Sequence, residues 1–119
     1  MTPKEIALAA VKALDSKKGQ DIKMLETGHL TTLADYFVLC SATSTTQIKA
    51  LADVCEKMLK EAGEAPHHVE GHRGGTWILL DFSSVVVHIF NEEARAFYDL
   101  ERLWGDAIPV DLSDVLTEN

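Results

Sequence analysis

Three histidines and one glutamate lie close together after the middle of the sequence, and these residue types can bind a metal ion. They are His67, His68, Glu70 and His72. No His-Glu-x-x-His motif of the zinc-binding kind appears here, and Cys40 and Cys55 are not paired at zinc-finger intervals. We therefore expect no metal site and interpret this segment as a polar strand edge followed by a loop.

Hydroxyl and thiol groups that can act as nucleophiles gather around residue 40, at Cys40, Ser41 and Ser44. None lies in the Gly-x-Ser-x-Gly turn that exposes a catalytic serine. The glycines between residues 71 and 75 neither precede a predicted helix nor have the spacing of a phosphate-binding loop. The sequence therefore predicts a protein without catalytic activity and without a cofactor.

His88 differs from the other histidines because it alternates with apolar residues inside the strongly apolar segment 85–90. Two interpretations stay open. His88 is either a core histidine with a satisfied hydrogen bond or part of a surface that meets a partner.

The chain is acidic, with 11 Lys and Arg against 19 Asp and Glu and a net charge of −8. Such a field repels phosphate and lacks the counterion release that drives direct binding to nucleic acids. A basic protein is the better partner.

The two cysteines, Cys40 and Cys55, lie in apolar segments, which indicates buried thiols in a reducing compartment. No apolar run, including 77–80, is long enough to span a membrane, and the first residues lack the apolar core of a signal peptide. We therefore expect a cytosolic protein.

Local patterns predict the elements of one domain over residues 1–119. Capping-box patterns predict two helices, one after Thr2 and one after Ser44, the second ending near Gly63. Apolar, β-prone segments predict strands at 21–26, 35–40, 67–71, 77–82 and 85–90. A last helix is predicted from Asn91 to about Trp104, followed by a short extended segment at 108–111 and one helical turn. This order predicts an α/β fold with a mixed sheet of about five strands and helices on both faces.

The predicted last helix has an apolar sector wider than a single packing contact requires. At about 100° per residue, Phe97, Leu100 and Trp104 share one arc. We expect Phe97 and Leu100 to lie in the core. We expect Tyr98, Trp104 and Trp77 to form an interface, because exposed rings rimmed by charge are typical of binding hot spots.

Several segments, in order along most of the chain, match one protein family. They are Ala34-Asp35-Tyr36-Phe37-Val38-Leu39-Cys40-Ser41, Thr43-Ser44, Glu70-Gly71, Trp77-Ile78-Leu79-Leu80-Asp81, Val85-Val86-Val87-His88-Ile89-Phe90 and Phe97-Tyr98-x-Leu100-Glu101-x-Leu103-Trp104. In these segments the sequence resembles the ribosomal silencing factor family, also called the Iojap-like proteins. It departs from the usual pattern at Ala42, at Thr46 and at Ser83-Ser84, where the family commonly has glycine, arginine and Gly-Asp, so the turn geometry of the hairpin is expected to differ.

The resemblance implies a nucleotidyltransferase-like topology and a binding function. Members of the family bind protein fourteen of the large ribosomal subunit, block joining of the small subunit and lower translation when nutrients are scarce. They form homodimers off the ribosome. The residues expected to face the ribosome are Trp77, Asp81, His88, Phe90, Glu93, Tyr98, Leu103 and Trp104. Asp81, Glu93 and Glu101 are expected to pair with basic side chains of the partner.

Two alternatives accompany this hypothesis. The first is a factor for assembly of the large subunit, which the sequence does not separate from silencing. The second is a nucleotidyltransferase, which needs two carboxylates to hold magnesium. Here no acidic pair follows Cys40-Ser41-Ala42, and Asp81 stands alone on its strand, so nucleotide transfer is the weaker hypothesis.

Overall fold

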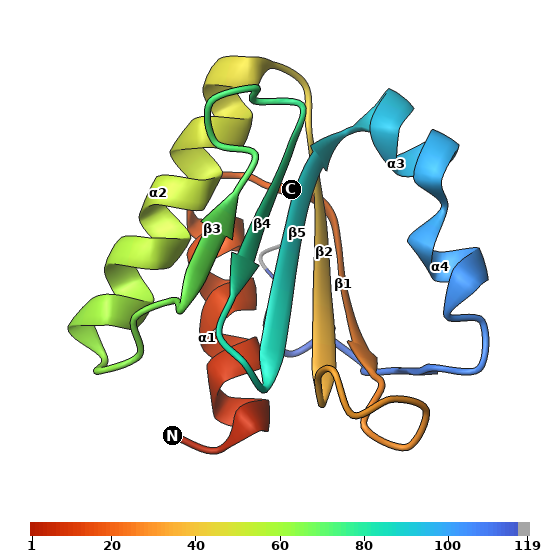
Figure 1. Cartoon of the computed structure of the whole chain (residues 1–119). Coiled ribbons are helices and arrows are strands. Elements are labelled where there is room, and N and C mark those ends of the chain that lie inside the picture. Colours follow the sequence, from red (N-terminus) through yellow and green to blue (C-terminus); the bar gives the residue numbers. More distant parts are fainter. Residues whose placement is uncertain (117–119) are drawn as a thin grey trace.

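A single mixed sheet organises the fold, with helices on both of its faces (Figure 1). The computed structural model describes residues 1–116. Within them the elements are α1 (Pro3–Ser16), β1 (Gln20–Glu26), β2 (Tyr36–Ala42), α2 (Thr45–Glu61), β3 (His68–Glu70), β4 (Trp77–Asp81), β5 (Val85–Asn91), α3 (Glu92–Tyr98), α4 (Leu100–Leu103) and β6 (Ile108–Pro109).

The strands lie in the order β3-β4-β5-β2-β1-β6. The central strands β2 and β5 are parallel, and every other neighbouring pair is antiparallel. The predicted α/β class and mixed sheet are confirmed. The sheet has one strand more than expected because Ile108 and Pro109 of the predicted extended segment pair with β1 and form the edge strand β6.

Capping explains where the two long helices begin. Thr2 Oγ1 accepts a hydrogen bond from the Glu5 backbone N–H, and Thr2 N–H donates to the Glu5 carboxylate, so the predicted capping box of α1 is confirmed. In α2 the Ser44 hydroxyl accepts from Gln47 N–H. The Gln47 side chain, however, accepts from the backbone N–H of Thr43 instead of returning to Ser44. Only half of the second predicted box therefore forms.

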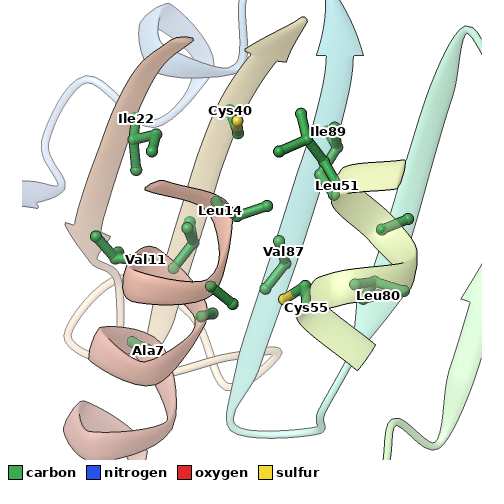
Figure 2. Close-up of a cluster of buried hydrophobic side chains, with 14 of the residues drawn as sticks. Ala7, Val11, Leu14, Ile22, Cys40, Leu51, Cys55, Leu80, Val87 and Ile89 are labelled. Carbon is green, nitrogen blue, oxygen red and sulfur yellow. The ribbon is translucent and has the colours of Figure 1, made fainter. Parts of the chain in front are cut away.

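The larger core lies between the sheet and the helices α1 and α2. Figure 2 shows Val11 and Leu14 of α1 and Cys55 of α2 meeting strand residues such as Cys40 and Val87. All five of these side chains are completely buried. The side chains of this larger core are therefore not accessible to a partner.

The smaller core lies on the opposite face, beneath α3 and α4 (Figure 1). Phe37, Leu39 and Phe90 of the central strands form its base, and Ala94 of α3 packs on it. The two short helices cover only part of this face, since all three residues of the edge strand β3 are exposed.

The predicted last helix is interrupted, which corrects the expectation of one helix from Asn91 to about Trp104. Asp99 has a left-handed backbone, with φ 44° and ψ 56°, and separates α3 from α4. Aspartate tolerates this conformation better than most residues because its short polar side chain suits local hydrogen bonding. The break turns the outer surface of α3 and α4 into a corner.

Candidate protein-binding surface

Apolar and aromatic side chains gather on the outside of α3 and α4. We call the group of Trp77, Phe97, Tyr98, Leu103 and Trp104 the aromatic corner. The exposed fractions of Phe97, Tyr98 and Leu103 are 82%, 51% and 71%, and these three side chains line one shallow hollow. Exposed apolar groups of this size beside one another are typical of a protein-binding surface.

Ring contacts hold the corner in a fixed arrangement. The centroid of Tyr98 lies 4.6 Å from that of Trp77, and Phe97 contacts Tyr98 edge-on at 5.1 Å. Trp104 packs edge-on against Phe37 of the smaller core at 5.3 Å. Trp77 and Trp104 are therefore half-buried supports of the corner, while Phe97 and Tyr98 stand at its surface.

The break at Asp99 explains why Phe97 is exposed. In a continuous helix Phe97 would share an arc with Leu100 and Trp104. Because the chain turns at Asp99, Leu100 and Trp104 contact the smaller core, whereas Phe97 points away from it. The prediction that Phe97 lies in the core is wrong, and the same prediction for Leu100 holds only in part, because Leu100 is partly buried and packs against the edge of the smaller core.

His88 is a core residue, which decides between its two interpretations. Only 6% of it is exposed, and its Nδ1 accepts a hydrogen bond from Trp77 Nε1 at 3.1 Å. Burial lowers the pKa of His88 to about 4, so the imidazole is neutral at pH 7. Phe90 is completely buried, with its centroid 5.6 Å from that of Trp77. In contrast to the expectation from the family, neither side chain is accessible to a partner, and both lie beneath Trp77.

The three acidic candidates differ in position. Asp81 lies at the end of β4 opposite Trp77, and its carboxylate accepts a hydrogen bond from Ser83 N–H at 2.7 Å in the hairpin turn. Ser83 has a left-handed backbone with φ 73°, which is where the family commonly has glycine. Glu93 is exposed, and its carboxylate makes no hydrogen bond or ion pair within residues 1–116. The carboxylate of Glu93 is therefore accessible to a basic partner.

Glu101, the third acidic candidate, is already paired within the chain. Its two carboxylate oxygens accept from Arg95 Nε at 2.9 Å and from Lys23 Nζ at 2.7 Å. Burial alone would raise the pKa of Glu101, but these two hydrogen bonds and the two positive charges outweigh it and lower the pKa. The prediction that Glu101 is available to a partner is therefore not met in this structure.

Arg95 is the residue that sequence reasoning missed. At about 100° per residue Arg95 falls outside the apolar arc of Phe97, Leu100 and Trp104, yet only 7% of it is exposed. Its partners, the exposed Asp21 and the buried Ser41, lie 74 and 54 positions away in the sequence. No local signal in the sequence could have identified these contacts.

In the described part of the chain, two of the three clustered histidines are paired with carboxylates, and both cysteines are buried. Within residues 1–116, no group of three or more His, Cys, Asp or Glu side chains is arranged to hold a metal ion. His68 pairs with Glu70, and His72 pairs with Asp53 of α2. Burial raises the pKa of both cysteine thiols to about 12. In the same range, no helix has the length and apolar character needed to cross a membrane.

Comparison with known proteins gives consistent matches. A family model described as "Ribosomal silencing factor during starvation" matches residues 1–119. A ribosomal silencing factor from Halalkalibacterium halodurans is 37% identical over 117 residues, which are 98% of this chain and all of that protein. The mouse protein "Mitochondrial assembly of ribosomal large subunit protein 1" is 33% identical over 97 residues, which cover 79% of this chain and 42% of that protein.

The fold is also known from a solved structure. The crystal structure of a Chromobacterium violaceum protein superposes with a TM-score of 0.86 at 42% sequence identity, covering 88% of both chains.

Proposed function

Because this chain belongs to the ribosomal silencing factor family, we propose that it binds the large ribosomal subunit and keeps the small subunit from joining it. Translation then falls when nutrients are scarce. The protein acts as a binding module in the cytosol, and residues 1–119 form one domain. Its effect depends on occupying a surface and needs no cofactor.

The observation that carries the proposal is the exposure of the aromatic corner. Phe97 and Leu103 leave 82% and 71% of their surface in contact with solvent. A folded chain gains nothing from such exposure, whereas burying these side chains against a partner removes apolar area from water at about 25 cal/mol per Å². The half-buried Trp77 and Trp104 provide a rigid base, which reduces the entropy lost on binding.

Charge favours a basic protein as the direct partner. The net charge is −8, and Glu92, Glu93 and Asp106 are exposed on or near α3 and α4. We propose that this partner is protein fourteen of the large subunit, as the family resemblance implies. Opposite charges around an apolar centre increase the rate of encounter and fix the orientation of the complex.

Co-sedimentation tests the proposal directly. The protein, added to purified subunits at a magnesium concentration that permits joining, should migrate with the large subunit and reduce the peak of joined ribosomes. A pull-down with isolated large-subunit proteins should retain protein fourteen. Migration with the small subunit alone, or an unchanged peak of joined ribosomes at saturating protein, would refute the proposal.

A role in assembly of the large subunit is the second candidate, and the name of the mouse relative favours it. Silencing and assembly predict different products in a strain without the protein. Loss of an assembly factor leads to accumulation of large-subunit precursors during rapid growth. Loss of a silencing factor leaves mature subunits but raises the fraction of joined ribosomes in starved cells.

Off the ribosome we propose a homodimer, which sedimentation equilibrium over a range of concentrations would detect. We also propose that the protein transfers no nucleotide. Asp81 supports a hairpin turn, and within residues 1–116 it belongs to no group of three or more metal-ligating side chains. Magnesium-dependent turnover that disappears in Asp81→Ala would overturn this view.

A further inference from the structure

Arg95 lies where an apolar residue would be expected, between α3 and the sheet. Its side chain is 8% exposed, and it occupies the inner surface of α3, next to Ala94. Placing a charged group in such a position costs free energy unless its hydrogen bonds are satisfied. The arrangement therefore requires specific partners.

One side chain connects four elements. Arg95 Nη1 donates to the backbone oxygen of Asp21 in β1 at 2.6 Å and to Ser41 Oγ in β2 at 2.8 Å. Its Nε donates to Glu101 of α4 at 2.9 Å. The guanidinium carbon lies 5.9 Å from the ring centroid of Phe90 in β5.

The short helix α4 has few other attachments. No residue of α4 is buried, and its connection to α3 passes through the left-handed Asp99 without a side-chain cap. Glu101 is the residue of α4 that Arg95 and Lys23 hold against the sheet. The adjoining Trp104 contacts Phe37. Without the contact to Arg95, fewer interactions would hold α4 against the sheet, and its orientation would be less well defined.

From these contacts we infer that Arg95 is a positioning residue, which sets the angle between α3 and α4 and thereby the shape of the aromatic corner. Phe97 and Tyr98 precede the turn, and Leu103 and Trp104 follow it. The two halves form one surface only while the turn is held. The part of this inference that concerns ribosome binding rests on the proposed function, whereas the part that concerns α4 does not.

The physics of buried ion pairs separates positioning from stability. Replacing both partners of a buried ion pair with apolar residues is often neutral for stability, whereas removing one partner destabilises because it leaves a buried charge unpaired. In Arg95→Met the remaining partner Glu101 is part exposed and keeps its ion pair with Lys23, so the variant leaves no fully buried charge. A merely structural role predicts that any loss of binding follows a loss of folded protein.

The first test measures α4 without any ribosome. The sequence contains two tryptophans, so Trp77→Phe leaves Trp104 as the single indole probe beside Glu101. In that background, Arg95→Met should shift the emission of Trp104 to longer wavelength at a temperature where the far-ultraviolet circular dichroism is unchanged. Arg73→Met makes the same chemical change at an exposed arginine in the loop before β4 and should leave the emission unchanged.

The second test measures binding to large subunits by co-sedimentation, in the protein that keeps Trp77. Arg95→Met should weaken binding about tenfold or more, as expected for loss of a preorganised hot spot, and Arg73→Met should not. Glu101→Gln weakens the same contact from the side of α4, so its effect and that of Arg95→Met should be less than additive.

The outcomes can be told apart. An unchanged Trp104 emission in Arg95→Met would overturn the inference, and so would full affinity for large subunits despite a shifted emission. If the wild-type protein itself fails to bind large subunits, the proposed function is refuted, while the emission of Trp104 still decides whether Arg95 positions α4.

Discussion

The indole of Trp77 donates a hydrogen bond to Nδ1 of His88 at 3.1 Å, with the two ring centroids 5.8 Å apart. This bond requires a ring nitrogen of His88 that carries no proton. It links the neutral state of a buried histidine to the position of a tryptophan at the aromatic corner.

The stability of the protein should fall as the pH falls from 6.5 towards 4. Burial lowers the pKa of His88 from 6.5 to about 4, so the unfolded state binds a proton in this range and the folded state does not. The stabilising effect of keeping His88 neutral is complete above pH 6.5. About 2 kcal/mol of this stability is lost between pH 7 and pH 5. Urea unfolding at several pH values measures this slope.

His88→Phe should flatten the slope, because its ring cannot take up a proton. At pH 7 this variant should lose about 1 kcal/mol through the missing hydrogen bond from Trp77. His67→Gln changes an exposed imidazole and provides the control. An equal slope in His88→Phe and the wild-type protein would show that another group causes the pH dependence.

Removing the most exposed side chains of the corner should weaken binding without weakening the fold. The double variant Phe97→Ala and Leu103→Ala is expected to lower affinity for large subunits at least tenfold, in co-sedimentation, because both side chains become buried only in the complex. The free energy of unfolding should change by no more than about 0.5 kcal/mol. Met58→Ala removes another exposed apolar side chain, on α2, and should leave affinity unchanged.

Tyr98 and Trp104 should respond differently to truncation. Both Tyr98→Ala and Trp104→Ala should weaken large-subunit binding. Tyr98 is half exposed, and its loss should lower stability by less than about 1 kcal/mol. Trp104 packs on Phe37 and the smaller core, so Trp104→Ala should lower the stability by about 2 kcal/mol. Thermal unfolding measures the stability of both variants, and equal losses of stability would contradict the placement of these two rings.

Gly71 should tolerate no side chain. Its φ is 82°, and a methyl group there would overlap the carbonyl oxygen of Trp77. Gly71→Ala should therefore lower stability by more than about 2 kcal/mol and displace Trp77. Gly63 also has a positive φ, but nothing lies near the position of its missing Cβ. Gly63→Ala should lower stability by only about 1 kcal/mol; equal effects on urea unfolding would show that backbone strain alone matters at Gly71.

Local sequence patterns were sufficient for the scaffold. The alternation and apolar runs of the strands, the capping threonine and serine, and the glycine after α2 each act within a few residues. Thr2 and Ser44 begin their helices as predicted, and Gly63 has the expected left-handed backbone. The aromatic content of the corner was also visible in the sequence, because residue type does not depend on folding.

Only the tertiary structure decided how the corner is arranged. The turn at Asp99 exposes Phe97, and a helical projection that assumes 3.6 residues per turn cannot include such a break. The buried state of His88 depends on Trp77 and Phe37, and that of Arg95 depends on Asp21 and Ser41. These neighbours are brought together by sheet pairing and helix packing between distant segments, so neither burial nor a lowered pKa can be derived from the residues that adjoin them in sequence.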